Sequence, residues 1–210
     1  MTTSRDLAQK YLTEAREILG QLDPVQIEAF TDVLFEAWTT GNTVYVCGNG
    51  GSASTAQHLA ADLFKCAIVD GKPRVRVMSL NDNMPLISAL VNDEGWNEVY
   101  VQQLITWWRP GDVVLGISVH GGQGRGQAGL WSRNVVRALQ FANENGGKSL
   151  GLVGFDGGTV KQICTRALLV PAESTAHTEG LHVVIHHMIT KLLRQKIGQS
   201  ANQRREVSGS

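Results

Sequence analysis

The sequence predicts an α/β protein built on a doubly wound parallel sheet that is flanked by helices. Short apolar runs alternate with helix-like segments along most of the chain, and the run Val113–Ser118 has the character of a buried central strand. Glycine-rich loops follow two of these runs, at Gly48 and after Ser118. Such alternation is typical of parallel strands joined by crossover helices, with ligands bound at the strands' carboxyl ends.

Two predicted helices precede the first strand. The first runs from Thr3 or Ser4 to about Leu22, and Asp23-Pro24 then supplies a cap and a first-turn proline for a second helix over about Val25–Thr39. We expect residues 1–40 to form a helical hairpin that serves oligomerisation. The apolar faces alone fit equally well a hairpin that covers the chain's own sheet.

The remaining elements follow from apolar runs and the turn residues between them. Residues 41–198 are expected to form the α/β domain, and the polar residues 199–210 a disordered tail. Strands are expected from 44 and at 74–79, 113–118, 149–154 and 167–170, and helices at 53–63, 82–90, 97–106, 134–145, 160–164 and 178–197.

Composition excludes several classes of function. Lys and Arg number 19, as do Asp and Glu, so no net charge attracts nucleic acid or an anionic membrane surface. No signal peptide or membrane-length apolar run is visible. The three widely spaced cysteines predict free thiols in a reducing compartment, and we expect a cytoplasmic protein.

The two glycine-rich loops are candidate anion-binding sites. Gly48–Ser52 links a strand to a helix, an arrangement that presents backbone N–H groups and a helix N-terminus to a phosphate, with Ser52 as the helix cap. Gly50 and Gly51 would let a ligand approach the backbone. The second loop contains His120 and Gly121, and its Arg125 is either a phosphate ligand or a solvated loop residue. A tight turn without a ligand is the alternative for the first loop.

Histidines and carboxylates gather on two predicted helices. His58 and Asp62 share a face of the helix after the first loop, and Glu179, His182 and His186 share a face of the last helix. His187 is expected to point elsewhere, because it lies about 100° around that helix. These residues suggest a divalent metal site, most plausibly zinc, and a polar subunit interface is the alternative.

A proton-transfer or metal site beside a phosphate-binding loop suggests chemistry on a sugar phosphate. A carboxylate that takes a carbon-bound proton and a histidine that serves the oxygens can interconvert aldose and ketose. A metal would polarise the carbonyl and stabilise the enediolate.

These residues resemble the sugar isomerase (SIS) domain, and the phosphoheptose isomerase branch most closely. The resemblance rests on 44–63 with its Gly-Asn-Gly-Gly-Ser loop, on 80–96 with Asn-Asp-Asn and Asn-Asp-Glu-Gly-Trp, and on 113–118, and it covers nearly the whole chain. It implies a homotetramer with active sites between subunits. It also implies conversion of sedoheptulose 7-phosphate to a heptose 7-phosphate, often with zinc.

The resemblance also implies roles for individual residues. His58 stands where the family has a metal-ligating histidine, His186 where it has a second histidine that is both ligand and general acid/base, and Asp62 where it has the catalytic glutamate. The phosphate and sugar would be held by Asn49, Ser52, Asn83, Ser118, His120 and Ser132.

Three departures from the family pattern bear on substrate and metal. Asp62 is one methylene shorter than glutamate, and Thr178 replaces a metal-ligating glutamine, so we expect Thr178 in the substrate pocket and His182 or Glu179 as a substitute ligand. His120 replaces a phosphate-binding serine, and the loop 122–131 is longer than in the family. Two alternatives therefore stay open: an isomerase of a different acidic or phosphorylated sugar, and a non-catalytic SIS regulator or replication-initiation adaptor.

Overall fold

A five-stranded parallel sheet forms the centre of the molecule. The structure is a computed structural model that describes residues 2–122 and 131–200. The strand order is β2-β1-β3-β4-β5, and all four neighbouring pairs run parallel. The strands are β1 (Thr43–Gly48), β2 (Arg76–Ser79), β3 (Val113–Ser118), β4 (Lys148–Val153) and β5 (Arg166–Leu169). The predicted α/β class is confirmed.

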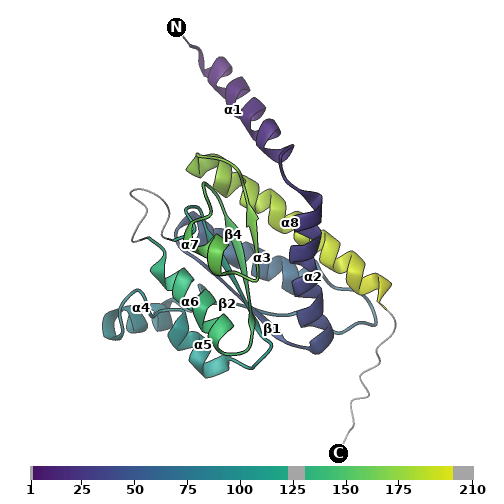
Figure 1. The fold of residues 1–210 in the computed structure, drawn as a ribbon, viewed down its shortest axis with the longest axis vertical. Coiled ribbons are helices and arrows are strands. Elements are labelled where there is room, and N and C mark those ends of the chain that lie inside the picture. Colours follow the sequence, from purple (N-terminus) through teal and green to yellow (C-terminus); the bar gives the residue numbers. More distant parts are fainter. Residues whose placement is uncertain (1, 123–130, 201–210) are drawn as a thin grey trace, which may run out of the picture.

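Helices cover both faces of this sheet (Figure 1). The helices are α1 (Ser4–Leu19), α2 (Pro24–Thr40), α3 (Gly51–Lys65), α4 (Met84–Asp93), α5 (Val101–Trp107), α6 (Arg133–Glu144), α7 (Gly158–Ile163) and α8 (Thr175–Gln199). One hydrophobic core joins the sheet to α2, α3 and α8, and a second joins its other face to α5, α6 and α7. In the described part of the chain, no helix is both long and apolar enough to cross a membrane.

The side chains of β1 point alternately into these two cores. Val44 and Val46 belong to the core beneath α2, α3 and α8, whereas Tyr45 and Cys47 belong to the core beneath α5 and α6. A strand buried on both faces is expected to be apolar throughout, which is why 44–47 and 113–118 are recognisable in the sequence. Predicted boundaries elsewhere differ from the observed ones by a few residues at most element ends.

The N-terminal helices depart from the expected hairpin. In Figure 1, α1 projects from the body and α2 continues in roughly the same direction instead of folding back. No residue of α1 is buried, and Leu7, Leu12 and Leu19 are exposed. The helix forms locally instead, because Thr3 and Asp6 make a complete capping box at its start. Tyr11 stacks on His177 of α8, with ring centroids 4.1 Å apart, and Ile18 packs against the core, whereas Leu7, Leu12 and Leu19 stay exposed in the single chain.

The strand order places a switch point between β1 and β3. β1 continues into α3 on one face of the sheet, and β3 is followed, after the second glycine-rich loop, by α6 on the other face. Chain segments leave in opposite directions at such a point, and open α/β sheets bind ligands in the crevice expected beyond the strand ends there. Both predicted phosphate loops flank this crevice.

At the other end of the sheet, Asp112 ties β1 to β3. This carboxylate is almost wholly buried and accepts hydrogen bonds from the backbone N–H groups of Thr43 (2.8 Å) and Arg109 (2.9 Å). A third, longer bond comes from the Asn42 amide (3.3 Å). The bonds therefore fix where β1 begins relative to β3.

Replacing Asp112 should destabilise the fold. Asp112→Ala leaves buried N–H donors without acceptors, and we expect it to lower the free energy of unfolding by about 2–4 kcal/mol in urea titrations. Asp82→Ala, at an exposed carboxylate in the turn before α4, is the matched control and should change stability by less than about 0.5 kcal/mol. Equal stabilities of the two variants would show that Asp112 does not hold the strands.

Candidate active site

The first glycine loop has the backbone that an anion site requires. Gly50 adopts φ 55° and ψ −126°, a conformation that disfavours any side chain, and α3 begins at the next residue. Ser52 does not cap the helix as predicted, because the helix starts one residue earlier and Ser52 lies buried within its first turn. The N-cap is Gly50, which provides no side-chain hydrogen bond.

Glu179 of α8 lies against this helix N-terminus. A Cβ atom added to Gly51 would come within 2.4–2.6 Å of the Glu179 carboxylate, so a larger residue there would push this side chain aside. A carboxylate is favoured at this position because the helix dipole and the free N–H groups attract negative charge. Glu179 therefore lies beside the first glycine loop and not in the histidine group.

An amide network holds the loop in place. Asn49 and Asn134 exchange two hydrogen bonds (2.8 and 2.9 Å), and the Asn49 amide also lies 3.4 Å from the Ser132 hydroxyl. The Tyr100 hydroxyl donates to the Gly48 carbonyl and contacts the Asn49 amide oxygen (3.1 Å). The loop after β1 and the start of α6 are thus joined across the crevice before any ligand binds.

Asn81, which sequence reasoning missed, completes this network. Its side chain donates to the Gly48 carbonyl (2.9 Å) and accepts from the Gly48 N–H (3.2 Å). The Asn-Asp-Asn run at 81–83 is the sequence signal for this position, although only its Asn83 is predicted to bind the substrate. Asn83 is exposed and caps α4 by accepting from the Leu86 N–H (3.1 Å).

The second loop is also folded back on itself. The buried Ser118 hydroxyl accepts from the Gly121 N–H (3.1 Å), and the Gly121 carbonyl accepts from the Val160 N–H (2.9 Å). His120 lies between two aromatic rings, with ring centroids 4.2 Å from Phe155 and 5.1 Å from Trp131. Arg125 lies outside the described residues, as does most of the long loop 122–131.

Ser132 and Thr178 occupy different positions relative to the crevice. Ser132 has left-handed backbone geometry (φ 56°) at the start of α6 and faces Asn49. Thr178 is completely buried, with its hydroxyl 3.5 Å from the Ala172 carbonyl and its side chain against Gly154. Of these two, Ser132 alone is seen to contact the first glycine loop.

A compact group of three histidines and one aspartate lies between α3 and α8. His58, Asp62, His186 and His187 each offer a ligand atom within 4.8 Å of the others. One Asp62 oxygen lies 3.4 Å from His187 Nε2, 3.5 Å from His186 Nδ1 and 3.8 Å from His58 Nε2. The two helices therefore bring together residues more than 120 positions apart.

His186 occupies the buried base of this group. Its side chain is fully buried, and neither ring nitrogen has a hydrogen-bond partner among the described residues. Burial lowers its pKa to about 4, helped by the neighbouring His187 and His58 and opposed by Asp62. The imidazole is consequently neutral at pH 7, which is the form that binds metals.

The group fits a divalent metal ion. Buried polar atoms without partners are rare in folded proteins and call for an explanation. Three imidazoles and a carboxylate are also the ligand types that zinc and related transition metals take. The half-exposed His58 and His187 leave the group open on its outer side.

The membership of this group corrects the sequence prediction. His187 was expected to point away but reaches Asp62 and lies 3.4 Å from His58. Glu179 and His182, predicted as metal ligands, are not brought into it. Glu179 lies at Gly51, and His182 is a buried histidine that donates to the Val153 carbonyl and whose pKa burial lowers to about 4.

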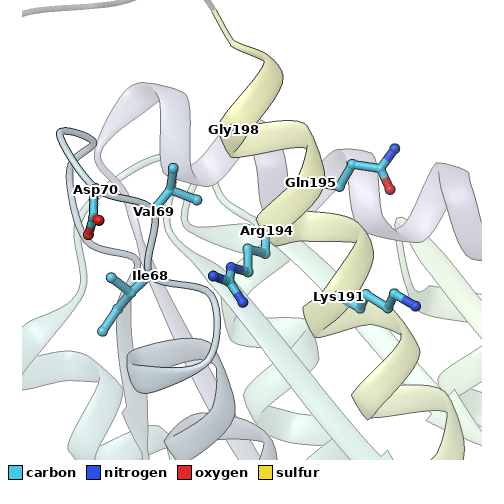
Figure 2. Close-up of a pocket in the computed structure, with 7 residues that line it drawn as sticks. All are labelled: Ile68, Val69, Asp70, Lys191, Arg194, Gln195 and Gly198. Carbon is cyan, nitrogen blue, oxygen red and sulfur yellow. The ribbon is translucent and has the colours of Figure 1, made fainter.

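A separate hollow lies nearer the C-terminal end of α8. Its volume is about 540 Å³, and it lies between Ile68–Asp70 and the last turns of α8 (Figure 2). Lys191 and Arg194 follow His187 by four and seven residues, about one and two helical turns. In Figure 2, Arg194 points toward the Ile68–Asp70 segment, whereas Lys191 extends away from it. Arg194 is therefore the cation that points into this hollow, which shares no lining residue with the histidine group.

Comparisons with known proteins agree with this architecture. The model of the SIS domain family matches residues 10–153. The phosphoheptose isomerase of Pelobacter propionicus is 37% identical over 181 residues, which cover 86% of this chain and 90% of that protein. The lincomycin biosynthesis protein LmbN of Streptomyces lincolnensis is 37% identical over 191 residues, or 89% of this chain and 68% of that protein.

A solved structure shows the same fold. The phosphoheptose isomerase GmhA of Neisseria gonorrhoeae is 25% identical and superposes with a TM-score of 0.78, covering 92% of this chain and all of that chain. A second, from Francisella tularensis, is 24% identical with a TM-score of 0.80. The chain therefore belongs to the SIS domain family, in its phosphoheptose isomerase branch.

Proposed function

We propose that the protein interconverts the ketose and aldose forms of a sugar phosphate, with sedoheptulose 7-phosphate and a heptose 7-phosphate as the pair. The observation that carries this proposal is the group of His58, Asp62, His186 and His187 between α3 and α8. Relatives named phosphoheptose isomerase, at 30–37% identity, support the substrate class.

The proposed chemistry needs a base for carbon and a proton carrier for oxygen. Asp62 removes the proton from the carbon beside the carbonyl, which leaves an enediolate, and the proton returns to the neighbouring carbon. His186, neutral because it is buried, moves the proton between the two oxygens. One Asp62 oxygen faces the three imidazoles, and the other lies toward Cys66 (3.5 Å).

A divalent metal, which we propose to be zinc, fits the same residues. Held by His58, Asp62, His186 and His187, it supplies polarisation of the substrate carbonyl. The phosphate is assigned to the backbone N–H groups of the two glycine loops with Asn49, Ser118 and Ser132. His58 lies seven residues beyond Gly51 along α3, which corresponds to about 10 Å.

The substrate can differ from sedoheptulose 7-phosphate. LmbN, named for lincomycin biosynthesis, is as similar in sequence as the Pelobacter propionicus isomerase. His120, with aromatic rings on two sides, replaces a serine of the family pattern near the phosphate loop. A different phosphorylated sugar is therefore the second candidate substrate.

We also propose a homotetramer with active sites between subunits. The unburied α1 exposes apolar side chains, and the outer side of the histidine group is open, so a second copy has two surfaces to cover. A cytoplasmic location is part of the proposal, and the three free cysteines support it.

Removing the base or the proton carrier should abolish turnover. We expect Asp62→Asn and His186→Ala to lower the rate of sedoheptulose 7-phosphate isomerisation at least about 100-fold, because each removes a proton-transfer group. Asp70→Asn, at an exposed carboxylate beyond the end of α3, should keep the rate. Other ketose 7- and 8-phosphates serve as parallel substrates.

Two results would count against this assignment. Unchanged rates in both variants would remove Asp62 and His186 from the mechanism. Tight binding of sugar phosphates without turnover by the native protein, on every ketose phosphate offered, would favour a regulator or adaptor instead.

Metal binding can be measured separately from activity. Titration of zinc into metal-free protein in a calorimeter should show one ion per chain. His58→Ala and His187→Ala should each raise the dissociation constant for zinc at least about tenfold. His120→Ala is the matched control, because its imidazole lies outside the group. Equal affinities in all three variants would show that the ion binds elsewhere.

The oligomer should depend on the apolar residues of α1. Leu7→Glu with Leu12→Glu should dissociate the tetramer in size-exclusion chromatography with light scattering, while the circular dichroism spectrum stays that of a folded chain. Gln9→Glu adds a charge to the same helix at a polar position and should leave the tetramer intact. A tetramer that survives the double change would mean that α1 does not form the interface.

A further inference from the structure

A second cavity lies at the end of the sheet away from the glycine loops. Its volume is about 490 Å³, a typical size for a small-molecule site, and it lies near the amino ends of β1 and β2. Thr43 and Tyr45 of β1 are in register with Arg76 and Met78 of β2, so these four side chains share one face of the sheet. β2 is the edge strand, which leaves this corner open.

Three arginines from separate segments line the cavity. Arg74 precedes β2, Arg76 begins it, and Arg109 follows α5. All three are exposed, and within residues 2–122 and 131–200 none forms an ion pair, although Arg76 Nε lies 3.4 Å from the Thr43 hydroxyl. No described acidic residue lines the cavity.

Among the described residues, the nearby carboxylate of Asp112 forms no ion pair with these side chains. Its oxygens accept from the backbone N–H groups of Thr43 and Arg109 and from the Asn42 amide. These bonds instead fix the position of the segment that carries Arg109. Three guanidinium groups in a chain of zero formal net charge are therefore gathered at one corner without an ion pair among the described residues.

Aromatic rings complete the walls. Tyr45 is buried and donates its hydroxyl hydrogen to the Trp107 carbonyl (2.9 Å), whereas Trp107 and Phe64 are 56% and 65% exposed. Large exposed aromatic side chains beside cations are a platform on which a planar base can stack. A second hollow, of about 220 Å³, shares Arg74 and Arg76 and is also lined by Lys72.

We propose that this corner is a binding site for a nucleoside diphosphate. Guanidinium groups bind phosphate oxygens through paired hydrogen bonds, and three of them match the charge of a diphosphate. The base would lie against Trp107 or Phe64, and the diphosphate between Arg74, Arg76 and Arg109. A nucleic-acid surface fits less well, because such surfaces need a longer basic track than one concave corner.

Calorimetric titration with ADP, GDP, UDP and CDP tests the site directly. At least one of them should bind once per chain, with pyrophosphate and the free nucleoside each at least tenfold weaker. Arg74→Gln and Arg109→Gln should each weaken binding of that nucleotide at least tenfold. Trp107→Ala should weaken the binding of the nucleotide but leave the affinity for pyrophosphate unchanged, because the substitution removes only the stacking surface.

Arg166→Gln is the matched control. Arg166 is an exposed arginine on β5, the opposite edge of the sheet, and its loss should leave nucleotide affinity unchanged. Titrations without sugar phosphate keep the result independent of isomerase activity. Circular dichroism checks that each variant is folded.

Three outcomes would overturn the proposal. Absence of binding by all four diphosphates at millimolar concentration would remove the site. Pyrophosphate binding as tightly as the best nucleotide would reduce it to an anion site without base recognition. Tighter binding of a single-stranded oligonucleotide, with a steep salt dependence, would identify a nucleic-acid surface instead.

Discussion

The contact between α3 and α8 is the constraint on which the candidate active site depends. Leu59 and Leu63 of α3 and Ile185 and Ile189 of α8 belong to the same buried core, so apolar burial fixes the two helices against each other. The same contact encloses His186 without a hydrogen-bond partner. An uncompensated buried imidazole opposes folding, and ligation of a metal would offset that cost.

The crevice between β1 and β3 is the second part of the candidate active site, where we place the phosphate of the substrate. Its loops are fixed by hydrogen bonds between the side-chain amides of Asn49 and Asn134, and by a hydrogen bond from the Asn81 amide to the Gly48 carbonyl. The backbone is therefore ordered before a ligand arrives. Preorganised N–H groups lose little entropy when a phosphate binds. In the proposed mechanism, phosphate recognition and proton transfer are separated along α3, because one is assigned to its first turn and the other to Asp62 together with His186 of α8.

Much of this arrangement could be predicted from the sequence, because buried parallel strands and glycine loops leave local signals. The strand 113–118 is of this kind. The meeting of His58 and Asp62 with His186 has no local signal, and it was expected only from the family resemblance. His187 was missed because a helical wheel places each side chain only by its angle around the helix axis. A histidine on the flank of a helix contact can turn toward the partner helix, as His187 does toward Asp62.

Other features had no local signal. The contact of Glu179 with Gly51 joins two helices distant in sequence, and the helical spacing that suggested a metal ligand fits the observed position equally well. The apolar pattern of α1 is present, but Leu7, Leu12 and Leu19 stay exposed within one chain. The cluster of Arg74, Arg76 and Arg109 depends on strand order, because it forms only when β2 lies beside β1 and β1 beside β3.

X-ray absorption spectroscopy at the zinc edge can show whether the ion binds between α3 and α8, because it reports the ligands of the ion itself. For zinc-loaded protein, we predict a coordination shell of nitrogen and oxygen with the outer-shell scattering of three imidazoles. Loss of one imidazole is expected in His187→Ala. A shell containing sulfur, or one with fewer than two imidazoles in the native protein, would contradict the assignment of the ion to the helix pair.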